Sequence, residues 1–123
     1  MNGKPKLLVV DDEESLRTIL RDELSHQNYT VRDAENGKAA LEILKQEKHD
    51  IVLLDVMMPE MDGLELLRII RKENLARRVV MLTGVDELKI ARESLQSGAD
   101  DFITKPFQFQ SLFACLDRVL KEE

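Results

Sequence analysis

The sequence predicts an α/β protein built on a five-stranded parallel sheet with helices on both faces. Apolar runs alternate with segments of helical period along the whole chain, which is typical of a parallel sheet with crossover helices. Three of the runs are continuous and rich in Val, Ile and Leu, as expected for strands that are buried on both faces. Five strands in 123 residues suit the strand order 2-1-3-4-5, whereas an α+β fold would need its strands to be grouped.

The strands are expected at five short apolar runs, and a helix is expected after each of them. The runs cover residues 7–10, 29–31, 51–54, 79–82 and 102–104, of which 29–31 is the weakest. Apolar residues three or four positions apart predict the core-facing stripe of each helix. These stripes are Leu16, Ile19, Leu20 and Leu24; Ala39, Ala40, Ile43 and Leu44; Leu66, Ile69 and Ile70; Leu88, Ala91 and Leu95; and Phe109, Leu112, Phe113, Leu116, Val119 and Leu120.

Length and composition predict one cytoplasmic domain over residues 1–123. The 18 basic and 24 acidic residues give a net charge of −6, which argues against direct nucleic-acid binding. No apolar run approaches the ~20 residues of a membrane span, and the start MNGKPKL has no apolar region of a signal peptide. The single cysteine, Cys115, excludes an internal disulfide framework and fits a reducing compartment.

Chemically active side chains follow four of the predicted strands. Asp11 and Asp12 follow the first strand, Asp55 the third, Thr83 the fourth and Lys105 the fifth. Acidic residues after a strand also suit the positive end of a helix dipole. Considered alone, Thr83 would be an ordinary strand residue and Lys105 a solvated loop residue. However, ligands of open α/β sheets bind at the carboxyl ends of the strands, and these strands are neighbours in the expected order. The joint placement therefore favours a functional site.

The residue types in this cluster suit phosphoryl transfer. Three carboxylates repel one another, and Lys105 supplies only one positive charge, so a hard divalent cation is expected as well. An aspartate can act as the nucleophile that forms an aspartyl phosphate. With Asp55 as the acceptor, Asp11 and Asp12 are left for the metal, and Thr83 and Lys105 for the phosphoryl oxygens.

These motifs resemble the receiver domain of two-component response regulators. The resemblance rests on LLVVDDEE (7–14), IVLLDVMMPEMDGLELL (51–67), VVMLTG (79–84) and GADDFITKPF (98–107), which together cover essentially the whole chain. It implies a flavodoxin-like receiver fold that is phosphorylated by a sensor histidine kinase or a phosphotransfer protein. It also implies a protein that catalyses only its own phosphorylation and dephosphorylation, and so is no enzyme for other substrates.

The resemblance also implies a metal site and a phosphoacceptor. Asp55 would accept the phosphoryl group. Asp12 and Asp55 would bind Mg²⁺ or Mn²⁺ directly, together with the backbone carbonyl of Met57, and Asp11 would reach the metal through water. Lys105 would pair with the phosphoryl group, ahead of a cis peptide bond to the proline that follows it.

Switching residues are implied too, with some departures from the family pattern. Thr83 would bond the phosphoryl group and Phe102 would turn inward, although many members carry Tyr at the Phe102 position. Met57 and Val85 are apolar at positions that flank the water's route in the family, which predicts slow or moderate dephosphorylation. Where winged-helix regulators have an acidic residue and an Arg for dimer pairing, this chain has Ser111 and Cys115, which argues against that kind of dimer.

Two contact surfaces follow from the resemblance. A kinase would dock on the first helix, where the candidate residues are Glu14, Ser15, Thr18 and Asp22. Output, to a separate target protein or to a fused output domain, would involve the fourth helix, fifth strand and fifth helix. The candidates there lie off the expected core stripes: Ile90, Ser111, Ala114, Cys115 and Arg118. An ordinary surface role is the alternative for all of these residues.

Three other functions compete with this interpretation. A haloacid-dehalogenase-like phosphatase also uses an Asp nucleophile and Mg²⁺, but it needs an Asp-x-Asp pattern on its first strand, where this chain has adjacent Asp11 and Asp12. A flavodoxin-like FMN carrier needs a Ser/Thr/Gly phosphate loop after the first strand. A receiver-like module that binds partners without phosphorylation would not need the complete set of acceptor-site residues.

Overall fold

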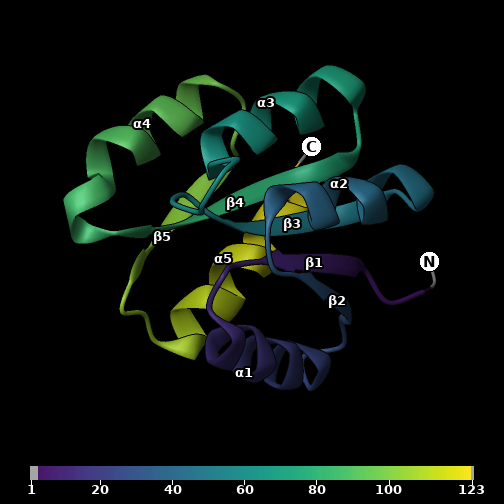
Figure 1. Ribbon diagram of the computed structural model, residues 1–123. Helices are drawn as coiled ribbons and strands as arrows, with labels where there is room; N and C mark the ends of the chain where they lie inside the picture. The colour runs from purple at the N-terminus through teal and green to yellow at the C-terminus, as the bar shows by residue number, and fades with distance from the viewer. Residues whose placement is uncertain (1–2, 123) are drawn as a thin grey trace.

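The sheet has the predicted strand order. The computed structural model describes residues 3–122, and the expected domain ends at 1, 2 and 123 lie outside the described residues. The described residues form one sheet of five parallel strands in the order β2-β1-β3-β4-β5, which confirms the prediction (Figure 1). The strands are β1 (Lys6–Val10), β2 (Thr30–Ala34), β3 (His49–Asp55), β4 (Ala76–Gly84) and β5 (Asp101–Lys105).

Helices cover both faces of this sheet. Helices α1 and α5 pack on one face, and α2, α3 and α4 pack on the other (Figure 1). Their bounds are α1 (Glu14–Ser25), α2 (Gly37–Gln46), α3 (Gly63–Glu73), α4 (Leu88–Gln96) and α5 (Phe109–Lys121), with a short 3₁₀ turn, η1 (Val85–Glu87), between β4 and α4. None of the described helices is long and apolar enough to cross a membrane.

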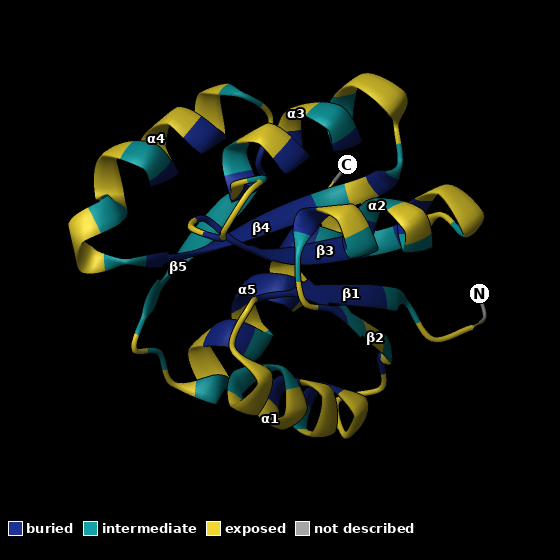
Figure 2. Ribbon diagram, in the orientation of Figure 1, coloured by how far each residue is buried: buried dark blue, intermediate teal, exposed yellow. Residues whose placement is uncertain are grey.

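The alternating side chains of the central strands supply two separate cores. On β1, Leu8 and Val10 face the layer of α2, α3 and α4, whereas Leu7 and Val9 face α1 and α5. Residues 51–54 of β3 alternate in the same way, and all are fully buried. Figure 2 shows this as a dark band through the middle of the sheet. Burial on both faces explains why these strands are continuous apolar runs.

Strands β2 and β4 differ most from their predicted ranges, because polar residues take part in them. The second strand was expected at 29–31 but runs from Thr30 to Ala34, at the edge of the sheet. Strand β4 begins at Ala76, ahead of the expected 79, and includes two arginines. One of them, Arg78, forms an ion pair with Asp100 at 3.4 Å. This ion pair lets a charged residue lie in the strand, and a search for apolar runs cannot detect it.

The predicted faces of α1 and α4 were partly wrong. Ile19, expected in the core stripe of α1, is 49% exposed. On α4, Leu88 and Leu95 are also exposed, whereas Ile90, expected on the surface, packs against the core. Ser94 takes the buried position instead, because its hydroxyl donates to the Ile90 carbonyl oxygen at 2.9 Å and so needs no water.

One candidate output residue on α5 was also misplaced. Cys115 was expected on the surface, but it is only 5% exposed and joins the core beside Leu112 and Leu116. Ser111, Ala114 and Arg118 are exposed, as their positions off the core stripe predicted.

Candidate functional site

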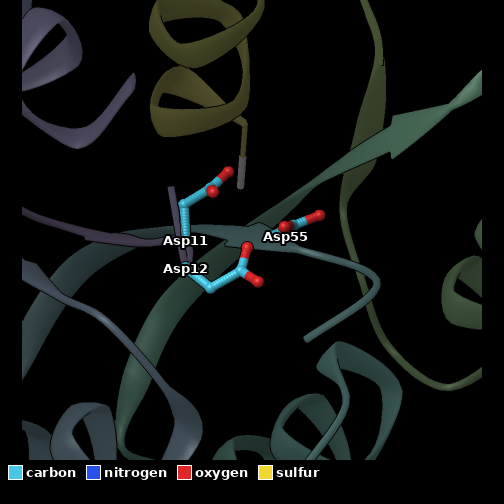
Figure 3. Close-up of side chains that lie close together, drawn as sticks. All are labelled: Asp11, Asp12 and Asp55. Carbon is cyan, nitrogen blue, oxygen red and sulfur yellow. The ribbon is translucent and has the colours of Figure 1, made fainter. Parts of the chain in front are cut away.

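The acidic residues converge at the carboxyl ends of β1 and β3. Asp11 directly follows β1 and Asp55 is the last residue of β3, and the two strands are adjacent, with Val10 opposite Leu54. Together with Asp12, these residues each offer a carboxylate oxygen, and the three oxygens lie within 4.8 Å of one another (Figure 3). The predicted cluster of three carboxylates is therefore present.

Lys105 joins the cluster from the end of β5. Its Nζ lies 3.0 Å from Asp11 Oδ2 and 3.6 Å from Asp55 Oδ1. Asp11 is fully buried and Asp55 is 5% exposed, whereas Asp12 is exposed. Because a buried carboxylate is costly without a partner, the ammonium group offsets part of the charge of Asp11 and Asp55, and Asp12 lies in the solvent.

Burial and charge together change the proton affinity of this site. Burial, and then the negative charge of Asp11, raises the pKa of Asp55 from 3.8 to about 6, although Lys105 acts in the opposite direction. Burial alone would lower the pKa of Lys105, but its hydrogen bond to Asp11 and the charge of Asp55 hold that pKa above its ordinary value. Lys105 is therefore charged, and Asp55 is ionised at neutral pH only at an energetic cost.

Backbone contacts fix the positions of the two buried carboxylates. Asp11 Oδ1 accepts from the Glu13 N–H at 2.9 Å, and Arg17 donates to the Asp11 carbonyl oxygen at 2.9 Å. Asp55 Oδ1 accepts a long hydrogen bond of 3.4 Å from the Met57 N–H. Helix α3 begins against the end of β3 at Gly63, where a Cβ would collide with the Asp55 carbonyl oxygen, so the turn needs glycine.

The two predicted switch residues lie on β4 and β5. Thr83 is fully buried near the end of β4, and its hydroxyl donates to the Gly84 carbonyl oxygen at 3.2 Å. Phe102 on β5 is half-buried and packs against the core on the side of α2, α3 and α4. The peptide bond between Lys105 and Pro106 is cis, as the resemblance implied. Met57 and Val85, two residues after Asp55 and Thr83, are both exposed.

Sequence reasoning did not identify one polar contact at the end of β4. The Gly84 N–H donates to Glu87 Oε1 at 2.8 Å, and Glu87 is the last residue of η1. The sequence did contain a signal for this contact. Glu87 lies three positions after Gly84, which is the spacing of a capping box at the start of a helix.

The family comparison decides what kind of domain this is. The family model described as the response regulator receiver domain matches residues 7–117. The chain belongs to the response regulator receiver family. A receiver domain of this kind functions in two-component signalling, and the match does not favour the phosphatase or the flavin carrier. Receiver domains are not enzymes in the usual sense.

Curated relatives are transcriptional regulators that are longer than this chain. Among them are the alkaline phosphatase synthesis transcriptional regulatory protein PhoP of Bacillus subtilis, 40% identical over 116 residues, and the probable transcriptional regulator ycf27 of Porphyra purpurea, 42% identical over 120 residues. The matches cover 94% and 98% of this receiver chain but 48% and 49% of the relatives. The chain thus spans about half the length of the curated relatives it matches.

Solved receiver structures share the whole fold. The receiver domain of NtrX from Brucella abortus superimposes with a TM-score of 0.90 at 33% identity, covering 95% of this chain and 99% of that one. The chemotaxis protein CheY4 of Vibrio cholerae gives a TM-score of 0.88 at 30% identity, covering 95% of this chain and 99% of that one.

The donor set fits a hard divalent cation. Receiver domains bind Mg²⁺ at an acidic pocket, and Asp11, Asp12 and Asp55 form an acidic cluster here. All of the side-chain donors are carboxylate oxygens, the ligands that Mg²⁺ and Mn²⁺ prefer over nitrogen and sulfur. Lys105 offsets part of the negative charge, which leaves a net excess that a divalent cation would neutralise.

Proposed function

We propose that Asp55 is the phosphoacceptor of this receiver domain, with a phosphohistidine of a sensor kinase or phosphotransfer protein as the donor. The observation that supports this most strongly is the position of Asp55. Its carboxylate lies at the carboxyl end of the central strand, β3, 3.6 Å from Lys105 Nζ and clustered with Asp11 and Asp12. These neighbours match the needs of phosphoryl transfer, which are a nucleophile, a fixed cation and a metal site.

The transfer uses groups that are already in place. An Asp55 carboxylate oxygen attacks phosphorus, the P–N bond to the donor histidine breaks, and the bond electrons stay on the imidazole nitrogen, which takes a proton. With a pKa of about 6, Asp55 is mostly ionised at neutral pH and yet more basic than an ordinary aspartate, which suits a nucleophile. Lys105 stays charged and lies close enough to stabilise the phosphoryl oxygens.

The metal would be held mainly by side chains of this cluster. Asp12 and Asp55 would bind Mg²⁺ or Mn²⁺ directly with the Met57 carbonyl, and Asp11 would do so through water. When bound, the cation neutralises charge on the phosphoryl oxygens. The role of Asp12 is supported by its exposure, since it is the one acid of the cluster that is open to solvent.

Phosphorylation would change the surface through Thr83 and Lys105. A ligand shifts an equilibrium only through contacts that differ between the two states. Moving the ratio from 1:99 to 99:1 needs ~5.5 kcal/mol. Two hydrogen bonds to a charged group supply ~1.5–3 kcal/mol each, which approaches that value. Thr83 would break its bond to the Gly84 carbonyl, and half-buried Phe102 would fill the space that Thr83 leaves.

Both contact surfaces remain proposals. Glu14, Ser15, Thr18 and Asp22 are exposed on α1 and are available to a kinase in the cytoplasm. On the output side, a target protein or a fused output domain would contact α4, β5 and α5, where Ser111, Ala114 and Arg118 are exposed. Cys115 and Ile90 contribute less than expected, because they are buried or half-buried. Nucleic acid and membrane contacts by this domain itself are not proposed.

Intact mass measurement tests the proposed acceptor. The wild type, incubated with acetyl phosphate and Mg²⁺, should gain one phosphoryl group, and EDTA should prevent the gain. Asp55→Asn should gain none, whereas the matched control Asp22→Asn, on exposed α1, should behave as the wild type. Equal labelling of Asp55→Asn and wild type would overturn the assignment.

A further inference from the structure

The loop after β4 is held by two hydrogen bonds that share one residue. Gly84 accepts from the Thr83 hydroxyl through its carbonyl oxygen at 3.2 Å, and its N–H donates to Glu87 Oε1 at 2.8 Å. Glu87 is half-buried and ends η1, the turn that leads directly into α4. The backbone of Gly84 therefore links the predicted switch residue to the start of α4.

The Gly84 N–H points toward the side of the sheet where Asp55 lies. The Leu82 carbonyl oxygen accepts from the Val56 N–H at 2.9 Å, so the backbone groups of Leu82 face β3. Residues two apart on an extended strand direct their backbone groups to the same neighbour, and Gly84 is extended, with φ −78° and ψ 163°. Its N–H thus faces the strand whose last residue is Asp55.

We propose that Glu87 restrains the switch by occupying the Gly84 N–H, a donor that a phosphoryl group on Asp55 would otherwise take. This inference rests on the proposed function of Asp55. The carboxylate of Glu87 and the phosphoryl group are both anions and compete for one N–H. Phosphorylation therefore displaces Glu87 from Gly84, and because Glu87 ends η1, the displacement releases the turn that positions α4.

A simple cap is the alternative explanation of the same contact. In a complete capping box, the N-cap side chain also accepts a hydrogen bond from the backbone N–H of the third helical residue. Gly84 has no side chain, so only the bond from its N–H to Glu87 exists. If Glu87 only caps η1, removing its carboxylate leaves the affinity for a phosphoryl mimic unchanged or weaker. If Glu87 competes with the phosphoryl group, the same change raises that affinity. The two explanations therefore differ in the sign of the effect.

Beryllium fluoride, a mimic of the phosphoryl group on aspartate, provides the probe. Titrated with Mg²⁺ present, Glu87→Ala should bind it about ten-fold more tightly than the wild type, equivalent to ~1.4 kcal/mol. Glu87→Gln keeps an oxygen acceptor but loses the charge, and should gain about three-fold. The control Asp86→Ala removes one negative charge from the exposed neighbouring residue of η1, and should stay within about two-fold of the wild type.

The Gly84 amide resonance gives a second measurement that a simple cap would not change in the same way. In the wild type it should shift on beryllofluoride binding together with the resonance of the Glu87 carboxyl carbon, because Glu87 leaves Gly84, whereas a simple cap keeps these two groups bonded. Normal wild-type binding with an unchanged or weaker Glu87→Ala affinity, or an equal gain in Asp86→Ala, would overturn this inference alone. A wild type that binds no beryllofluoride would overturn the proposed function, and this inference with it.

Discussion

Asp55→Asn should stabilise the metal-free protein at neutral pH. Burial and the charge of Asp11 raise the pKa of Asp55 from 3.8 to about 6. Since one pKa unit corresponds to ~1.4 kcal/mol, the ionised carboxylate lowers the free energy of unfolding by about 3 kcal/mol at pH 7. Asparagine has nearly the same shape without the charge, and Lys105 keeps its closer partner, Asp11, at 3.0 Å.

The pH window of the effect follows from the direction of the shift. Between pH 3.8 and about 6 the folded protein binds more protons at Asp55 than the unfolded chain does. The stabilisation by protonated Asp55 is therefore fully present below the unfolded pKa and is lost as the pH rises through the folded pKa. Asp55→Asn does not titrate, so its advantage over the wild type should be near zero in acid and should grow to a plateau above pH 6.

Urea unfolding in EDTA, repeated across this pH range at constant ionic strength, measures the difference. The control Asp22→Asn replaces an exposed aspartate of α1, so a gain that grows with pH in Asp55→Asn alone identifies the buried carboxylate as its source. An Asp55→Asn variant whose advantage is the same at every pH, or that is less stable than the wild type at pH 7, would refute the reasoning.

Three further substitutions test the arrangement of the site. Asp12→Ala should keep the metal-free stability within about 0.5 kcal/mol, because this carboxylate is exposed, yet lose most of the Mg²⁺-induced rise in melting temperature; a full rise would exclude it as a ligand. Lys105→Met leaves fully buried Asp11 without its cation and should cost about 3 kcal/mol in urea unfolding, and a loss near zero would contradict this pairing. Gly63→Ala should cost about 2 kcal/mol and slow labelling of Asp55, because a Cβ collides with the Asp55 carbonyl oxygen; unchanged stability and labelling rate would show that the turn tolerates a side chain.

The sheet and the acidic cluster were predictable because they depend on local order in the sequence. Continuous apolar runs marked β1, β3 and β4, and strand order then brought Asp11, Asp55 and Lys105 to one edge. In β1 and β3 the carboxyl end of the strand lies at, or one residue past, the point where the apolar run stops. The convergence of these side chains therefore followed from topology.

Helix faces and loop contacts were less predictable because they depend on side-chain hydrogen bonds, on packing and on exact loop geometry, none of which hydrophobic periodicity encodes. Ser94 is buried on α4 because it bonds the Ile90 carbonyl, a partner that hydrophobic periodicity ignores. Ile19 remains exposed although it continues the apolar stripe of α1. The bond from Gly84 to Glu87 required the conformation of η1, which no residue pattern specifies fully.

The most direct test of the central claim is chemical identification of the phosphorylated residue. An acyl phosphate is reduced by borohydride to an alcohol, so a phosphorylated aspartate becomes homoserine. After labelling with a phosphohistidine donor and Mg²⁺, then reduction and peptide mass spectrometry, homoserine should appear at position 55 and at no other aspartate. Aspartate unchanged at position 55, with homoserine at Asp11 or Asp12 instead, would contradict the account.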